Sequence, residues 1–261
     1  SDLAAMAASP LGMLASVALP KGDDEKVREL TGGLLDVASR FGCPLIGGDL
    51  TASTGPLMIS LTVIGKAPSG EAVLRSGALP GHEIWVTGTP GEAAAVLEFL
   101  ELERQGKAGG LPRPDEAALE RFFTPLPRIP EARFLFENGP PAALIDISDG
   151  LAGDLGHILE ASGVGAELEG SSIPSGGYSA RLARALGHSE HHFLLHGGED
   201  YELCLTAPEG LFGRLPGDFE KRFGLALSRI GVITDRKGHL VLRGRDGECG
   251  EIHAGGYEHF S

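Results

Sequence analysis

Hydrophobic residues recur at helical spacing near the start of the chain and predict one long helix there. Over residues 24–41, apolar side chains return every three or four positions, from Val27 through Leu34 to Phe41, and would form one face of that helix. Residues 1–8 are expected to form a shorter helix. The chain is therefore expected to open with helical structure before its first strand.

Runs of β-branched and alternating apolar residues predict strands along the rest of the chain. Residues 43–46 and 57–63 are strand-like, and the glycine-rich segment 47–51 (GGDLT) is expected to be a loop between them. The other predicted elements are strands over residues 83–87, 142–147 and 230–233, and helices that begin near residues 92 and 151.

The alternation of strands and helices predicts a mixed α/β (α+β) protein with two domains. Glycine and proline begin to punctuate the sequence at Arg75 (RSGALPG), so the domain boundary is placed near residue 73. The predicted domains are residues 1–73 and 74–261. Residues 111–128 are rich in proline and charge; they are expected to hold one helix between irregular segments, and no chemistry is assigned to them.

The charge balance limits the classes of partner. Lys and Arg total 22 against 36 Asp and Glu, giving a formal charge of −14, and no stripe of basic residues is present. Binding to nucleic acid is therefore not expected. An acidic protein that handles phosphates needs cations to offset repulsion from its carboxylates, so clustered aspartates become candidates for a divalent-metal site.

The cysteines indicate a reducing compartment, and the hydropathy indicates that no helix spans a membrane. The three cysteines, Cys43, Cys204 and Cys249, show no paired spacing, so neither a disulfide framework nor a CxxC zinc site is expected. Cys204 follows Leu203 in an apolar run and is expected in the core. Apolar runs stop well short of the roughly 20 residues that a membrane helix needs. A cytoplasmic protein without membrane contact is predicted.

The segment IDISDG is the strongest candidate for chemistry. Asp146 and Ser148 lie two positions apart on a predicted strand and share a face, and Asp149 falls where the strand gives way to a helix. A shared divalent cation would stabilise both carboxylates. The alternative is that Asp149 is only the N-cap of the helix, a position that aspartate suits. The residues alone leave both interpretations open.

Three further positions give weaker signals. Gly48 and Asp49 would present a carboxylate from a glycine loop that a phosphate can approach, although GGD is also a common turn. Arg75 fits either a phosphate clamp or a surface arginine. Asp2 would ordinarily be an acidic residue at a helix start. None of these positions identifies a site by itself.

Four histidines raise a separate possibility. His188 and His192 could share a helix face, with His191 and His196 close in sequence, and such a cluster could bind zinc. No acidic or thiolate ligand accompanies them at a standard spacing. A solvated loop near the substrate explains them adequately, and this explanation is favoured over zinc binding.

Taken together, the motifs resemble one family. They follow the order and approximate spacing found in thiamine-monophosphate kinases, within the superfamily that includes aminoimidazole ribonucleotide synthetase, and GGEDYEL and GYEHF are the most discriminating. The resemblance covers almost the whole chain. The motifs are SDLAAM, IGGD, RSGALPG, VTGTPGEAA, PRI, IDISDGLAGDLGHI, GGEDYEL and GYEHF.

The resemblance implies a Mg²⁺-dependent transfer of phosphate from ATP to thiamine monophosphate, in line and without a phosphoenzyme. It also implies a cytoplasmic homodimer assembled through residues 1–73, as the remainder of an ATP- and metal-binding domain. Asp146 and Asp149 would be catalytic. The implied contacts are Mg²⁺ for Asp2, Asp49, Asp146 and Asp149; ATP for Gly48, Asp49, Arg75 and Ser148; and substrate for Glu199 and Tyr257.

Two features keep other functions open. The family carries a GDD motif and a Ser/Thr-Asp motif ahead of the SDLAAM segment, and neither precedes that segment here, so part of the active site is expected to be missing from the chain as given. The GDD at residues 22–24 follows SDLAAM and lies just ahead of a predicted helix, where capping explains it. The alternatives are an ATP-dependent ligase or synthetase of the same superfamily and a non-catalytic nucleotide-binding module. GGEDYEL and GYEHF favour the kinase over the ligase.

Overall fold

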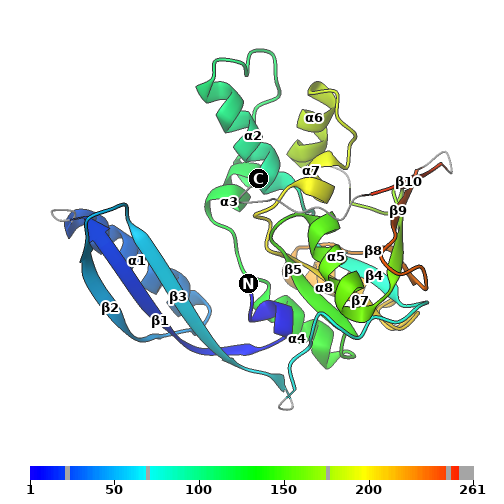
Figure 1. Ribbon diagram of the computed structural model, residues 1–261, viewed down its shortest axis with the longest axis horizontal. Helices are drawn as coiled ribbons and strands as arrows, with labels where there is room; N and C mark the ends of the chain where they lie inside the picture. The colour runs from blue at the N-terminus through cyan, green and yellow to red at the C-terminus, as the bar shows by residue number, and fades with distance from the viewer. Residues whose placement is uncertain (21–23, 69–70, 175–176, 245–247, 253–261) are drawn as a thin grey trace. The chain divides into compact units, whose positions relative to one another are not determined.

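The computed structural model describes residues 1–20, 24–68, 71–174, 177–244 and 248–252. It has two sheets with flanking helices, which confirms the predicted α/β class (Figure 1). Two compact units divide the chain: a shorter unit, Ala7–Ala72, and a longer unit made of Ser1–Met6 and the chain from Val73 onward. In the described part of the chain, no helix has both the length and the apolar character needed to cross a bilayer.

The shorter unit is a three-stranded sheet with one helix. Strand β1 (Ser9–Pro20) is central, parallel to β2 (Leu45–Ser53) and antiparallel to β3 (Met58–Lys66), and α1 (Asp24–Arg40) connects β1 to β2. The helix agrees with the predicted one. It packs on the sheet through a small apolar cluster that contains Met13, Leu34, Ala38 and Cys43.

Two predictions for residues 1–53 were wrong, and one strand was missed. Residues 1–8 contain only a 3₁₀ turn, η1 (Ala4–Met6), and β1 was not predicted, because its sequence SPLGMLASVALP has glycine, alanine and proline where strands usually carry β-branched residues. Residues 47–51 are not a loop but part of β2. There, a Cβ on Gly48 would lie 1.9 Å from the Ala15 carbonyl oxygen, so the close approach of β1 requires this glycine.

The longer unit is built on a seven-stranded sheet with the order β10-β9-β6-β8-β4-β7-β5. Neighbouring strands are antiparallel except for the parallel pair β6 and β9. Its strands are β4 (Glu83–Thr87), β5 (Ala143–Ile147), β6 (Gly165–Glu169), β7 (Glu202–Ala207), β8 (Leu227–Thr234), β9 (Leu240–Arg243) and β10 (Cys249–Glu251).

Seven helices of the longer unit are described. They are α2 (Glu92–Arg104), α3 (Glu116–Phe123), α4 (Ile129–Glu137), α5 (Leu151–Ser162), α6 (Gly177–Ala185), α7 (His192–His196) and α8 (Pro216–Phe223). Helix α5 buries Leu151, Leu155 and Ile158 in the core of the sheet, while α2, α3 and α6 share a second apolar cluster around Phe99 and Tyr178. Cys204 is fully buried in β7, as predicted.

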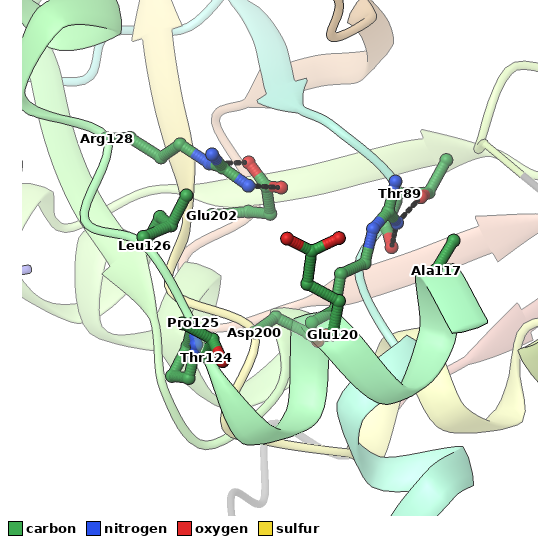
Figure 2. A pocket seen from close by; sticks show the side chains of 10 residues that line it. Thr89, Ala117, Glu120, Thr124, Pro125, Leu126, Arg128, Asp200 and Glu202 are labelled. Atoms are coloured by element: carbon green, nitrogen blue, oxygen red, sulfur yellow. Dashed lines mark hydrogen bonds and ion pairs between the residues drawn. The ribbon is translucent and has the colours of Figure 1, made fainter.

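A buried ion pair ties the start of α4 to the sheet. Arg128 donates from Nε and a terminal guanidinium nitrogen to the two oxygens of Glu202, at 2.9 and 2.6 Å (Figure 2). The hydroxyl of Thr87 donates to the same carboxylate at 2.6 Å, so β4, β7 and α4 meet at one charged group. The Arg128 and Glu202 side chains are only 12% and 4% exposed.

Loss of one partner should leave the other charge buried and unpaired. We expect Arg128→Ala to lower the free energy of unfolding by about 3–5 kcal/mol. Urea unfolding followed by fluorescence would measure this in the longer unit alone, because Trp85, in β4, is the only tryptophan of the chain.

The matched control is Arg113→Ala, which removes a 2.8 Å ion pair with Glu103 whose side chains are 77% and 43% exposed. That variant should lose no more than about 1 kcal/mol. Equal losses in the two variants would contradict a structural role for the Arg128–Glu202 pair.

Candidate active site

The IDISDG segment forms the end of a strand, a short loop and the start of a helix. Strand β5 ends at Ile147, Ser148 and Asp149 form the loop, and Gly150 is the N-cap residue of α5. The interpretation of Asp149 as the N-cap is therefore wrong. Asp149 remains half-buried, with its carboxylate not used for capping.

Asp154 holds this loop from inside the fold. Its Oδ2 accepts hydrogen bonds from the backbone amides of Ser148 and Asp149, at 2.9 and 3.0 Å. Burial raises the pKa of Asp154 to about 6; the two amide hydrogen bonds oppose that rise, and the charges of Asp149 and Asp146 add to it. The sequence interpretation missed Asp154, although its place among Leu151, Leu155 and Ile158 on the apolar face was a usable signal.

Asp146 lies near the amino-terminal turn. It is half-buried in β5, and the Ser1 hydroxyl donates a hydrogen bond to its Oδ2. Asp2, which follows Ser1 in the chain, is exposed. Asp2, Asp146 and Asp149 therefore all belong to the longer unit, around the carboxyl end of β5.

Metal-ligand geometry is not preformed. Within the described ranges, no group of three or more His, Cys, Asp or Glu side chains is placed to hold a metal ion. The oxygen donors of Asp2, Asp146 and Asp149 nevertheless suit Mg²⁺, which keeps several water ligands and often takes only one or two carboxylates from a protein. Of the four histidines considered as zinc ligands, His188 and His192 stack their rings, with 4.2 Å between the ring centroids.

The GGEDYEL segment is joined to the aspartate loop by backbone hydrogen bonds. The amide of Glu199 donates to the Ser148 carbonyl at 2.9 Å, and that of Tyr201 donates to the Ile147 carbonyl at 2.8 Å. A Cβ on Gly198 would lie 2.1 Å from the Ser148 oxygen, so glycine is required for this approach. The two motifs are thus held side by side.

The backbone of this segment is strained on both sides of Asp200. Glu199 and Tyr201 have φ angles of 68° and 53°, and Ala7 is the only other non-glycine residue in the described part with a positive φ. Each costs on the order of 1 kcal/mol. The Tyr201 hydroxyl donates a 2.8 Å hydrogen bond to the Glu199 carboxylate, so these two side chains lie together.

Asp200 points the other way, into the fold. Its carboxyl group accepts hydrogen bonds from the amides of Gly91 and Ala93 at the start of α2, at 2.6 and 3.4 Å. Burial raises the pKa of Asp200 to about 8; the amide hydrogen bonds act against that rise, and the charges of Glu202 and Glu92 add to it.

The remaining predicted residues belong to other segments of the chain. Gly48 and the exposed Asp49 are in β2 of the shorter unit. Arg75 is exposed in the segment before β4. Tyr257 lies outside the described residues. The structure thus brings together Asp2, Asp146, Ser148, Asp149 and Glu199 in the longer unit.

A pocket of about 300 Å³ lies behind Asp200 and Glu202 (Figure 2). Part of its wall comes from α3 and the segment before α4, to which the sequence interpretation assigned no chemistry. Glu120 stands between Thr89 and the Arg128–Glu202 pair. The pocket is lined by Thr89, Ala117, Glu120, Arg121, Thr124, Pro125, Leu126, Arg128, Asp200 and Glu202.

Comparisons with known proteins agree with this architecture. Residues 1–67 match the family described as AIR synthase related protein, N-terminal domain, and residues 80–243 match its C-terminal domain. The thiamine-monophosphate kinase of Escherichia coli (strain K12) is 38% identical over 263 residues, which cover 100% of this chain and 77% of that protein.

Two solved structures are similar over nearly the whole chain. Thiamine-monophosphate kinase from Stenotrophomonas maltophilia K279a has a TM-score of 0.78 at 35% identity and covers 95% of this chain and 75% of its own. AaThiL complexed with AMPPCP and TMP has a TM-score of 0.78 at 27% identity, with coverage of 99% and 76%. The fold and the two family matches thus define the class of the protein, an AIR synthase related protein. Within that class, the chain belongs to the thiamine-monophosphate kinase family.

The raised pKa of Asp200 predicts a pH-dependent stability. Because the folded state holds a proton that the unfolded chain has released, stability should fall as pH rises toward the folded pKa of about 8. The range of about pH 6 to 8 lies above the pKa of Asp154, so Asp200 can be tested there separately. As pH rises through this range, the free energy of unfolding of Asp200→Asn should fall less than that of the wild type, as measured by urea unfolding followed by Trp85 fluorescence.

Asp115→Asn is the control for that experiment. The hydrogen bond from Arg181 and then that from the Ala118 amide lower the pKa of Asp115, so its contribution is lost only at acidic pH, below this range. The free energy of unfolding of Asp115→Asn should therefore change with pH, between about pH 6 and 8, as steeply as that of the wild type. An unchanged slope in Asp200→Asn would show that Asp200 is ionised in the folded protein.

Proposed function

We propose that the protein transfers the γ-phosphate of ATP to thiamine monophosphate and so makes thiamine diphosphate and ADP. The observation that carries this proposal is the pairing of the Glu199–Tyr201 segment with Ile147 and Ser148, at the end of β5, through two backbone hydrogen bonds. It supports a site in which carboxylates that would bind metal-bound phosphates act together with a carboxylate that would bind a cationic acceptor. Relatives at 35% and 38% identity that are thiamine-monophosphate kinases support the same assignment.

The chemistry needs charge neutralisation more than a base. A phosphate monoester is largely dianionic near neutral pH, since its second pKa is about 6, so the acceptor oxygen attacks without a strong general base. Bound Mg²⁺ would offset the repulsion between the two polyanions and stabilise charge in an in-line transfer. The proposed ligands are Asp2, Asp49, Asp146 and Asp149.

The chain's own residues then orient the two substrates. Asp154 fixes the Ser148 and Asp149 amides, so the catalytic loop needs little rearrangement. Gly48, Asp49, Arg75 and Ser148 are proposed to contact ATP. Glu199 would pair with the positive charge of the acceptor, and Tyr257 would stack on its ring.

The exposed apolar side chains of the shorter unit support a second part of the proposal, that the protein is a homodimer; a cytoplasmic location is also proposed. Strands β2 and β3 expose large apolar side chains, among them Ile46, Leu50 and Met58, at 58%, 61% and 64%. Exposed apolar surface of this extent marks an interaction site. A second copy of the same unit is the partner we propose, and no described feature favours the ligase or the non-catalytic module over the kinase.

The product of the complete reading frame should convert thiamine monophosphate and ATP to thiamine diphosphate and ADP in equal amounts. Chromatography of thiamine esters with a coupled ADP assay would follow both products. Excess EDTA should abolish turnover and added Mg²⁺ should restore it. Thiamine, which lacks the acceptor phosphate, serves as the control and should release no ADP. Equal turnover in EDTA, or ADP release without thiamine diphosphate, would refute the proposal.

Asp146→Asn and Asp149→Asn should each lower kcat at least about a hundredfold, because electrostatic stabilisation of the transferred charge is lost. The fold should be retained, since Asp149 does not cap α5. Asp235→Asn, an exposed position after β8, is the matched control and should keep its rate. Near-normal rates for both site variants at saturating Mg²⁺ would show that these carboxylates are structural.

A further inference from the structure

We propose that Tyr201 is a positioning residue that orients the Glu199 carboxylate toward the acceptor. The inference rests on the proposed function, in which Glu199 contacts thiamine monophosphate. Its basis is the 2.8 Å hydrogen bond from the Tyr201 hydroxyl to Glu199 Oε2. Glu199 is exposed, so without this bond its carboxylate would sample many rotamers.

The backbone makes the contact possible. Residues two apart point to one face of a regular strand, but here the backbone is not that of a strand, because the φ angles of Glu199 and Tyr201 are 68° and 53°. Hydrogen bonds to Ile147 and Ser148 hold this conformation from one side. The carboxyl of Asp200 holds it from the other through the amides at the start of α2. Strain that is fixed from both sides typically marks a functional segment.

The chemistry of the pair suits a fixed orientation. A phenol that donates to a carboxylate forms a charge-assisted hydrogen bond, and the half-buried tyrosine ring has only two side-chain torsions to restrain. Burial, followed by the hydrogen bond and charge of Glu199, raises the pKa of Tyr201 to about 12, so its hydroxyl keeps its proton at neutral pH. The charges of Asp146 and Asp149 act in the same direction, which places Tyr201 within the field of the aspartate loop.

Kinetics of Tyr201→Phe separate positioning from a purely structural role. We expect the KM for thiamine monophosphate to rise about five- to twentyfold, while kcat and the KM for ATP stay within about twofold. If Tyr201 acts through Glu199, the double variant Glu199→Gln/Tyr201→Phe should match Glu199→Gln alone. Tyr178→Phe is the control, because the Tyr178 hydroxyl is buried without a hydrogen-bond partner in the described structure. It should leave both KM values unchanged.

A second measurement uses the wild-type protein. The chain has three tyrosines, so ring-labelled tyrosine gives few resonances, which the Tyr→Phe variants assign. Thiamine monophosphate should shift the Tyr201 signal and leave that of Tyr178 in place, whereas a non-hydrolysable ATP analogue alone should shift neither.

Several outcomes would overturn the inference. These are an unchanged KM for thiamine monophosphate in Tyr201→Phe, additive effects in the double variant, an equal rise in both KM values, or no shift of the Tyr201 signal on binding. A wild-type protein that does not phosphorylate thiamine monophosphate would instead refute the proposed function. The two failures are therefore distinguishable.

Discussion

The antiparallel pairing of β5 with β7 is the interaction on which the candidate site depends. Asp146 lies opposite Leu203 and Ile147 opposite Glu202, and the ladder continues past the strand ends as the amide bonds from Tyr201 and Glu199. Two motifs that are distant in the sequence meet because of this register. A slip of one residue would turn Asp146 to the opposite face of the sheet and separate it from the loop.

Carboxylates perform two different tasks around this pairing. Asp154, Asp200 and Glu202 face inward, and each is held by backbone amides or by a guanidinium and a hydroxyl. Glu199 is exposed, and Asp149 is half-buried and does not cap α5. The inward group fixes the loops, and the outward group is left for ligands. This division follows from the cost of burying a charge, since only carboxyl groups with full partners or a bound proton are stable inside.

The sequence predicted those parts of the fold whose signals are local. Residues 83–87 and the helix after Gly150 were found because apolar spacing and glycine punctuation are strong there. Strand β1 was missed because its central position, not its composition, makes it a strand. Asp200 and Glu202 were missed because their partners are distant: Gly91 and Asp200 lie 109 positions apart, and Arg128 and Glu202 lie 74 apart. The roles given to Arg75 and Tyr257 come from family resemblance and stay predictions.

The division of the chain also has a consequence for folding during synthesis. Ser1–Met6 belong to the longer unit, and the Val73 amide donates to the Met6 carbonyl, so the shorter unit is an insertion whose two ends meet. The ribosome completes this insertion before most of its host exists. Ser1 therefore reaches Asp146 only after the strand that carries Asp146 has been made, and closing that long loop is an entropic step that comes late. Asp2, which adjoins Ser1, is thus synthesised well before the strand beside which it is set in place.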